Sequence, residues 1–230
     1  MKTLGLIGGI SWISTIDYYR MINQGINDHL GGLNFAQCLI YSFNYADIKR
    51  NNDANDWDAT FLMVSRACSH LESCGADGIL LCANTMHYIA DRLQAQLKVP
   101  LIHIATTTLN EVLRHPIRKI GLLGTKFTME LDFIKFPFRE RGIEVLIPEE
   151  ADRAFIHGTI TGELGKGIVK QETKNRYLEI SKKLIGKGAQ GIILGCTEIP
   201  LLIQPGDLPV TVFDSTRLHA AAGVAFALGL

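Results

Sequence analysis

The sequence predicts an α/β protein built from two similar lobes with parallel sheets, related by a pseudo-two-fold internal repeat. Short apolar runs rich in β-branched residues alternate with amphipathic stretches at helical spacing, which is typical of parallel sheets covered by helices on both faces. Residues 75–85 align without a gap on residues 188–198. Three further similarities keep the same order along the chain and pair residues 2–8 with 118–124, residues 99–104 with 208–213 and residues 105–107 with 214–216. Ordered similarities of this kind indicate that one structural unit is repeated.

The first half of the chain contains four apolar runs that we expect to form strands, at residues 4–7, 36–41, 78–81 and 101–104. The stretches between them carry apolar residues three and four positions apart, which predicts helices at residues 15–30, 57–73, 86–96 and 107–114. The second half repeats this alternation, with strands expected at residues 120–123, 144–146, 191–194 and 210–213. Its helices are expected at residues 129–141, 175–187 and 217–228.

The repeat and the last helix set the expected domain boundaries. Residues 1–105 form the first lobe together with residues 215–230, since the last helix is expected to pack back on the first lobe. Residues 106–214 form the second lobe. An active-site cleft is expected between the lobes, because ligands of open parallel sheets bind at the carboxyl ends of the strands.

Composition excludes several classes of function. The chain carries 23 basic and 23 acidic side chains, and this balance offers no electrostatic surface for nucleic acid or for an anionic membrane. Its apolar runs are too short to span a bilayer. The amino terminus enters an apolar strand without the pattern of a signal peptide, so the expected location is the cytoplasm. An odd number of cysteines, five, and the lack of a C-x-x-C spacing argue against a disulfide framework and against a zinc site.

Polar residues follow the ends of the expected strands. The substrate-binding candidates at these positions are Gly9, Ile10, Ser11, Asn44, Tyr45, Asn84, Thr85, Thr125, Thr197 and Glu198. Residues 8–15 form a glycine-bearing turn that opens a helix, and the backbone N–H groups of such a turn suit a small carboxylate. Capping of the helix by serine and threonine is the alternative interpretation. The turn lacks the G-x-G-x-x-G pattern of dinucleotide sites.

Cys196 is the strongest candidate for a catalytic residue. It ends an expected buried strand and precedes Thr197 and Glu198 at an expected helix start. Backbone N–H groups at such a position stabilise a thiolate, so we expect the pKa of Cys196 to lie below its usual value of about 8.5. A thiolate can remove a proton from a carbon beside a carboxylate. Glu198 either caps the helix or holds a substrate amine.

Several other polar residues have two interpretations. His87 and His219 lie early on expected helices, where each either contacts a ligand or satisfies a helix cap. His103 lies within an apolar strand and is expected to be a core histidine. Lys126 and Lys166 either hold a distal substrate carboxylate or are solvated surface residues.

The two halves of the repeat differ at the position of Cys196. The alignment equates Cys196 with Ala83 and places Cys82 one residue too early. Adjacent side chains of an extended strand point to opposite faces, so Cys82 is expected to point away from the face that Ala83 occupies. Ala83 itself offers neither a proton nor a hydrogen bond from its side chain.

With these residues in view, the chain resembles the aspartate/glutamate racemase family, and within it the broad-specificity L-aspartate/L-glutamate racemases. The resemblance covers essentially the whole chain and rests on Gly8–Thr15, Asn84–His87, Leu122–Thr125, Gly195–Glu198 and Val212–Asp214. It implies two Rossmann-like lobes, a homodimer, and an isomerase that uses no pyridoxal phosphate, no other cofactor and no metal. The implied partner is a small amino acid or dicarboxylate, with neither nucleic acid nor a membrane involved.

The usual chemistry of the family places two cysteines on opposite faces of the substrate α-carbon, where one takes a proton and the other returns one. This chain has Ala83 where the family pattern has its first cysteine. One interpretation is a racemase of aspartate- or glutamate-like substrates, in which water or Cys82 replaces the absent acid. A second is a one-cysteine decarboxylase or isomerase, and a third is a protein that only binds a dicarboxylate.

Overall fold

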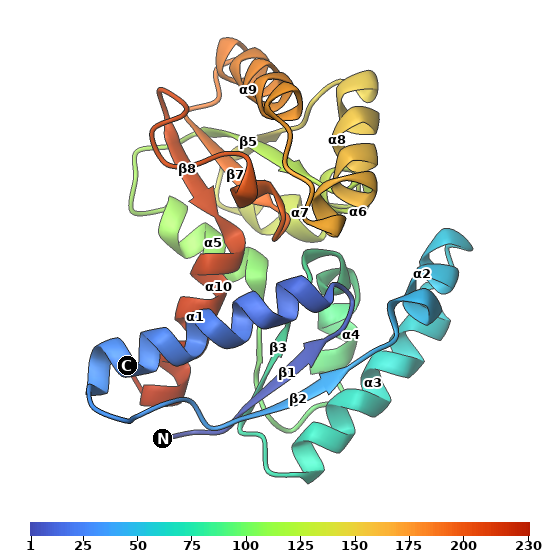
Figure 1. Ribbon diagram of the computed structural model, residues 1–230, viewed down its shortest axis with the longest axis vertical. Coiled ribbons are helices and arrows are strands. Elements are labelled where there is room, and N and C mark those ends of the chain that lie inside the picture. Colours follow the sequence, from blue (N-terminus) through green and yellow to red (C-terminus); the bar gives the residue numbers. More distant parts are fainter. The chain divides into compact units, whose positions relative to one another are not determined.

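Two units, each with its own four-stranded parallel sheet, make up the chain (Figure 1). The structure is a computed structural model and describes residues 1–230. Unit 1 consists of Met1–His103 and His219–Leu230, and unit 2 consists of Ile104–Leu218. The strand order is β2-β1-β3-β4 in unit 1 and β6-β5-β7-β8 in unit 2. These two orders are equivalent, so the predicted α/β fold of two similar lobes is confirmed.

Unit 1 contains the strands β1 (Leu4–Gly8), β2 (Cys38–Ser42), β3 (Gly78–Leu81) and β4 (Leu101–Ile102). Its helices are α1 (Trp12–Leu30), α2 (Tyr45–Asp53), α3 (Trp57–Ser73), the 3-10 helix η1 (Asn84–Ile89), α4 (Ala90–Gln94) and most of α10 (Ser215–Leu228).

One face of the unit 1 sheet is covered by α1 and α10. Tyr18, Ile22 and Ile26 are spaced four residues apart, which gives α1 one apolar side toward the strands. The shared core contains Leu4, Leu6, Tyr18, Ile22, Ile26, Leu80, Cys82, Ala220, Val224 and Ala227. Helix α3 contacts β1 and β2.

Unit 2 contains the strands β5 (Lys119–Gly124), β6 (Glu144–Leu146), β7 (Gly191–Gly195) and β8 (Thr211–Asp214). Its helices are α5 (Ile104–Val112), α6 (Lys126–Glu130), α7 (Asp132–Glu140), α8 (Glu150–Gly162), α9 (Gln171–Gly186) and the 3-10 helices η2 (Leu164–Lys166) and η3 (Ile199–Leu201).

The sheet of unit 2 is buried on both faces. Ile193 of β7 enters a core formed with α5 and α7. Ile192 and Leu194 enter a second core, formed with α8 and α9. Alternate side chains of β7 therefore lie in opposite cores, as the pleat of a strand requires.

The helix that follows the last strand of each sheet belongs to the other unit. Helix α5 follows β4 but packs in unit 2 through Leu109 and Val112. Helix α10 follows β8 but packs in unit 1 through Ala220 and Val224. The chain thus passes from unit 1 to unit 2 after His103 and returns after Leu218.

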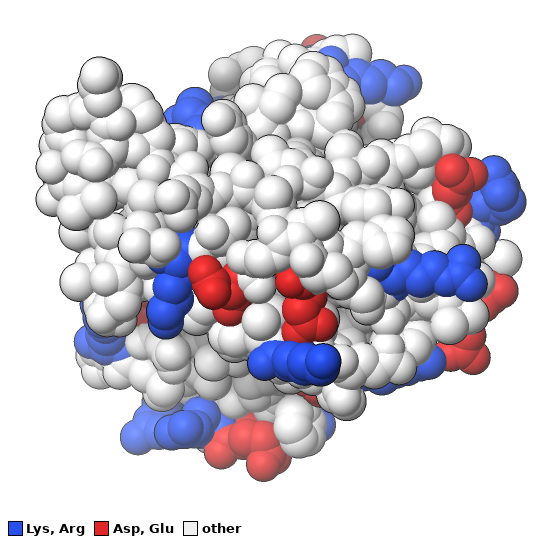
Figure 2. Space-filling model, turned by 90° about the horizontal axis from the view of Figure 1, so that it is seen from below, with Lys and Arg blue, Asp and Glu red and all other residues white.

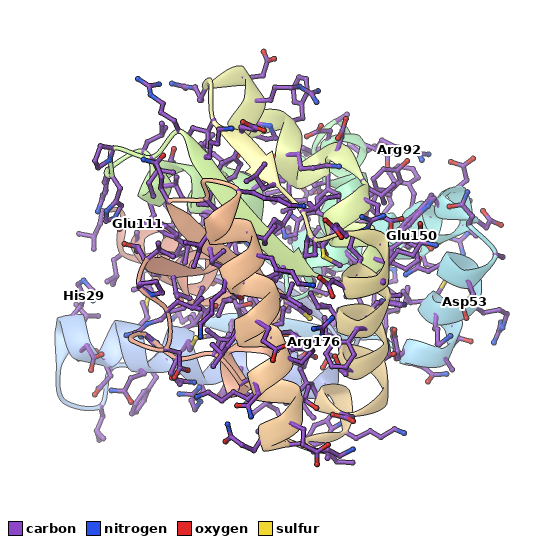
Figure 3. All side chains as sticks on the ribbon, turned by 90° about the horizontal axis from the view of Figure 1, so that it is seen from above. His29, Asp53, Arg92, Glu111, Glu150 and Arg176 are labelled. Atoms are coloured by element: carbon purple, nitrogen blue, oxygen red, sulfur yellow. The ribbon has the colours of Figure 1, made fainter.

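Charged side chains of both signs are interspersed on the face of the molecule that Figure 2 shows. One carboxylate with two basic partners is buried: Asp152 of α8 accepts hydrogen bonds from Arg176 at 2.6 Å and from Lys183 at 2.7 Å. Both basic residues lie on α9, and Arg176 is labelled in Figure 3. These contacts fix α9 to α8. None of the helices combines the length and the apolar character needed to cross a bilayer.

The structure contains two helices that periodicity did not predict. Helix α2 buries only Ile48 and Asn52, so it has no apolar stripe to recognise. Helix α8 contains Gly158 and Gly162, and glycine lowers the helix propensity of a segment.

Several predicted elements have different limits in the structure; the helix expected at residues 107–114, for example, is α5 at Ile104–Val112. The helix expected at residues 129–141 is divided into α6 and α7, because Leu131 adopts an extended conformation with ψ of 159°. The strand expected at residues 101–104 ends at Ile102, and α5 begins at Ile104.

Candidate functional site

Cys196 directly follows β7, one of the two central strands of unit 2. All residues of β7 are buried, so the end of this strand has little freedom to move. Ile192, Leu194 and Cys196 alternate along one face and belong to the core formed with α8 and α9. Cys196 is 7% exposed. The strand therefore holds the thiol in a fixed position at the carboxyl end of the sheet.

The thiol of Cys196 has an acidic partner two residues further along the chain. Its Sγ donates a hydrogen bond to Oε2 of Glu198 at 2.8 Å, and the hydroxyl of Thr197 donates to the same oxygen at 2.6 Å. Glu198 is 6% exposed, and a buried carboxylate needs donors of this kind. Its side chain makes no capping bond to the following 3-10 helix η3, so the capping interpretation of Glu198 is wrong.

The pKa of Cys196 lies well above its usual value, which corrects the expectation of a lowered pKa. Burial is the largest cause, and the charge of Glu198 and its hydrogen bond to the thiol act in the same direction. Backbone hydrogen bonds from Thr197 and Glu198 lower the pKa, as the sequence predicted, but they are outweighed. Cys196 is therefore a neutral thiol at rest, beside a carboxylate that can accept its proton.

The turn after β5 lies at the same edge of the sheet as Cys196. Gly124 pairs with Gly195, and a Cβ on Gly124 would lie 2.9 Å from the carbonyl oxygen of Gly195. Thr125 follows and caps α6, because its hydroxyl accepts a hydrogen bond from the N–H of Thr128 at 3.2 Å. The close approach of the two glycines brings Thr125 and Cys196 to neighbouring strand ends.

The equivalent turn after β1 in unit 1 is held by hydrogen bonds within the protein. Gly9 has a φ of +80°, and a Cβ there would lie 2.2 Å from the carbonyl oxygen of Phe43. The N–H of Gly9 donates to Oγ1 of Thr15 at 2.9 Å, so this N–H is already used. Ser11 is the N-cap of α1 and accepts from the N–H of Ser14 at 3.3 Å. Capping is thus the role that the structure shows for Ser11.

Ser14 also belongs to this turn, although it was not among the site residues predicted from the sequence. Its hydroxyl donates to the carbonyl oxygen of Cys82 at 2.7 Å, which joins the start of α1 to the end of β3. The sequence feature that could have identified Ser14 is its position in the motif Gly8–Thr15, three residues after the serine that caps α1.

Cys82 and Ala83 differ in their surroundings. Cys82 is 1% exposed and belongs to the core beneath α1 and α10, and burial raises its pKa. Ala83 is half-buried and has an extended backbone, with φ of −155° and ψ of 129°. The thiol of Cys82 is directed into the core, so it is not placed to replace the absent acid.

The other candidates lie near strand ends but differ in exposure. Ile10 is 9% exposed and Tyr45 is 44% exposed. Asn44 donates a hydrogen bond to Asp47 of α2 at 3.1 Å. Asn84 is buried at the start of η1, and Thr85 is half-buried beside it.

Three histidines form a cluster inside unit 1. The ring centroid of His87 lies 4.7 Å from that of His103 and 5.1 Å from that of His219. His219 donates from Nε2 to the carbonyl oxygen of Ile102 and accepts at Nδ1 from the hydroxyl of Tyr18, both at 2.7 Å. Burial lowers the pKa of all three histidines, and that of His219 to about 4. His219 is thereby a structural residue with both ring nitrogens bonded.

Lys126 and Lys166 are both exposed. The backbone N–H of Lys126 donates to Nδ1 of His157 at 3.3 Å, which places His157 beside the turn after β5. No pattern in the sequence pointed to His157. The structure brings together no group of three or more histidine, cysteine, aspartate or glutamate residues that could hold a metal ion.

Known proteins resemble this chain over nearly its full length. Residues 7–223 match the family described as Asp/Glu/Hydantoin racemase. The broad specificity amino-acid racemase RacX of Bacillus subtilis is 25% identical over 231 residues, covering 96% of each protein. The solved structure of a candidate Asp/Glu racemase from Yersinia pestis is 44% identical, with a TM-score of 0.93 over 99% of this chain and 100% of that one.

An aspartate racemase homologue from Pyrococcus horikoshii is 34% identical, with a TM-score of 0.87 over 99% of this chain and 100% of that one. The glutamate racemase from Aquifex pyrophilus shares the fold, with 20% identity and a TM-score of 0.67 over 97% of this chain and 83% of that one. Because the family match spans residues 7–223, the chain belongs to the Asp/Glu/Hydantoin racemase family.

Proposed function

We propose that the chain is an amino-acid racemase that needs no cofactor and acts on aspartate- or glutamate-like substrates, with Cys196 as its main acid/base residue. The observation that carries the proposal is the hydrogen bond of 2.8 Å from the Cys196 thiol to Glu198. Family membership and relatives named as racemases support the isomerase chemistry. We also propose that the protein works in the cytoplasm as a homodimer.

Proton removal starts from the neutral thiol beside a charged carboxylate. Glu198 takes the thiol proton, and the thiolate of Cys196 then takes the proton from the substrate α-carbon. The electron pair left on the α-carbon delocalises into the adjacent substrate carboxylate. When the steps run backward, the thiol returns a proton to the carbon and regains one from Glu198.

The opposite face of the α-carbon needs a different acid, because the position equivalent to Cys196 is Ala83. We propose that water protonates this face. The thiol of Cys196 has already regained a proton from the α-carbon, and the hydroxide that forms then takes the proton held by Glu198, which restores the charged carboxylate and water. A positioned acid typically contributes ~10²–10⁴ in rate, so inversion is slower than proton exchange at the face served by the thiol.

The substrate carboxylates are proposed to bind to short polar side chains at the strand ends. Thr125 and Thr197 are the candidates in unit 2, and Thr85 and Asn84 are the candidates in unit 1. Hydroxyl and amide groups of this kind donate hydrogen bonds to carboxylate oxygens.

A one-cysteine decarboxylase or isomerase is the second candidate function. It is favoured by Ala83 and by the position of Cys82 in the core of unit 1. Such an enzyme protonates a carbanion from one side only, and the neutral thiol of Cys196 can supply that proton. A dicarboxylate-binding protein without turnover is the remaining alternative.

The functions are separated by following the α-proton of a panel of amino acids in heavy water, with Cys196→Ala as control. A racemase incorporates deuterium at the α-carbon of L-aspartate or L-glutamate and produces the D-enantiomer. Carbon dioxide release from a substituted malonate identifies the decarboxylase. Binding of the amino acid with no exchange and no carbon dioxide release contradicts both enzyme functions.

A further inference from the structure

The exposed side of α1 carries an apolar stripe. Trp12, Ile16, Tyr19 and Leu30 are 66%, 52%, 48% and 49% exposed. With 3.6 residues per turn, these four side chains lie within about 60° of one another around the helix. The charged side chains in the body of α1 lie outside this arc and are Asp17, Arg20 and Asp28. The stripe thus lies between the buried side of the helix and its charged side.

The segment after α1 extends the stripe. Leu33 is 90% exposed and Phe35 is 51% exposed. The N–H of Ala36 donates to Oδ1 of Asn23 at 3.0 Å, which holds this segment against α1. His29, labelled in Figure 3, lies near the end of α1 where the segment begins.

Strand β2 continues the same surface. Ile40 is 44% exposed. It lies two residues after Cys38, which packs against the core beneath α1, so Ile40 points to the α1 side of the sheet. We call the surface formed by α1, residues 31–36 and β2 the α1/β2 face.

The free edge of β2 lacks the usual protection. In the sheet of unit 1, β2 is an end strand that pairs only with β1. From Gly31 to Ala46 the chain has no lysine, arginine, aspartate, glutamate or proline. Natural proteins use charges, proline or bulges to keep exposed edges from pairing with other chains. An edge without these features is typical of a surface that another chain covers.

The size of the α1/β2 face matches what a stable dimer needs. Its seven apolar side chains expose on the order of 700 Å², if each is about half exposed and has about 200 Å² in all. The largest apolar patch of a typical monomer is about 300–600 Å². A standard interface buries about 800 Å² on each partner.

We propose that the α1/β2 face binds the same face of a second copy of the chain in a two-fold symmetric dimer. A two-fold axis brings apolar side chains onto apolar side chains, and it brings the free edge of β2 toward the free edge of its copy. The seven apolar side chains of the face carry no charge that would select a partner of opposite sign, and the net charge of zero does not oppose self-association. At its margin, Asp17 and Arg20 neutralise each other at 3.2 Å.

This inference names the surface for the homodimer in the proposed function, and it does not depend on the chemistry of Cys196. The experiment measures the mass of the wild-type protein by sedimentation velocity and light scattering over a wide range of concentrations. The expected mass is twice the chain mass of 25.4 kDa. A wild-type protein that remains monomeric at every concentration overturns the inference, whatever its racemase activity.

The double variant Ile16→Glu/Leu33→Glu locates the interface. It is expected to be monomeric, since two charges would meet two charges across the axis. The matched control is Leu62→Glu on α3, which is 56% exposed and lies outside the α1/β2 face, and it is expected to stay dimeric. A double variant that stays dimeric while folded overturns the inference.

A second measurement guards against unfolding of the double variant. The single substitution Leu33→Asn changes a residue that is 90% exposed and therefore makes little contact within one copy. It is expected to weaken the dimer and to speed amide hydrogen exchange in β2, with exchange in β6 unchanged. An unchanged dissociation constant together with unchanged exchange in β2 overturns the inference.

Discussion

The thiol of Cys196 donates a hydrogen bond to Oε2 of Glu198 across 2.8 Å, although only Thr197 separates the two residues in the chain. This contact gives the two residues different tasks. The sulfur holds the proton because burial and the neighbouring charge raise its pKa. In the proposed mechanism, the carboxylate accepts the proton when a thiolate is required. The pair can therefore act as acid or as base without a second cysteine.

Glu198→Gln tests the pairing, because it removes the charge and keeps the size of the side chain. We expect the pKa of Cys196 to fall, since the charge of Glu198 and its hydrogen bond both raise it. We also expect α-proton exchange to slow by ~10²–10⁴, because an amide cannot accept the thiol proton. The pH dependence of alkylation by iodoacetamide, with Cys196→Ala as the blank, measures the pKa.

The two readouts of Glu198→Gln distinguish proton transfer from a structural role. A merely structural residue would lower activity without lowering the pKa of the thiol. Glu179→Gln is the matched control, because Glu179 is exposed on α9, and it is expected to change neither quantity. A thiol pKa that stays high in Glu198→Gln contradicts the account.

Ala83→Cys supplies the thiol that the internal repeat lacks. We expect racemisation of aspartate or glutamate to become faster, by up to ~10²–10⁴, because a positioned acid replaces water. Chiral chromatography of the product measures the rate. Ala83→Ser is the control, since a serine hydroxyl is a far weaker acid, and a smaller gain is expected. If a folded Ala83→Cys variant racemises no faster, the equivalence of Ala83 with Cys196 is wrong.

Gly9→Ala tests the close approach at the turn after β1. Both Gly9 and Gly142 have positive φ, but a Cβ on Gly9 would lie 2.2 Å from the carbonyl oxygen of Phe43, whereas Gly142 has nothing within 4 Å. We expect Gly142→Ala to lose about 1 kcal/mol of unfolding free energy, and Gly9→Ala to lose about 1–3 kcal/mol more. Urea unfolding measures both. Equal losses of unfolding free energy in the two variants would show that the backbone of Phe43 can move away from the new Cβ without destabilising the fold.

The histidine cluster makes the protein sensitive to acid. Burial lowers the pKa of His219 to about 4 from the unfolded value of 6.5, so below pH 6.5 the unfolded state binds a proton that the folded state excludes. The contribution of His219 to the free energy of unfolding is therefore complete above pH 6.5. It is lost as the pH falls toward 4, by up to about 3 kcal/mol. His87 and His103 act in the same direction.

Urea unfolding between pH 7 and pH 4 measures this effect, with His219→Gln as the test variant. We expect the variant to be less stable at neutral pH and to lose less stability on acidification. His29→Gln is the control, because His29 is exposed at the end of α1, and its slope is expected to match that of the wild type. Equal slopes in all three proteins would show that His219 does not contribute.

The local signals in the sequence predicted much of the fold and part of the site. Successive side chains of a strand point to opposite faces whatever the rest of the chain does, so the different directions of Cys82 and Ala83 were predictable. The repeat predicted two sheets with equivalent strand order. The pKa of Cys196 was predicted in the wrong direction. Backbone N–H groups are evident from the position of a residue, whereas burial depends on α8 and α9, which come from elsewhere in the chain.

The contact between Cys196 and Glu198 could not be predicted either. It depends on the turn after β7, where a side chain two residues later folds back toward the strand end. An alternating strand would have placed both side chains on one face but out of reach, and a helix would have placed them on different sides. Helix α2 was missed because Ile48 is its one buried apolar side chain.

The most direct test of the account compares two cysteine variants in heavy water. Nuclear magnetic resonance follows the α-proton of L-aspartate and L-glutamate with wild-type protein, Cys196→Ala and Cys82→Ala. We expect exchange to be lost in Cys196→Ala and to continue in folded Cys82→Ala, because only the thiol of Cys196 is paired with an acid at a strand end. Exchange that survives in Cys196→Ala, or that is lost in folded Cys82→Ala, would contradict it.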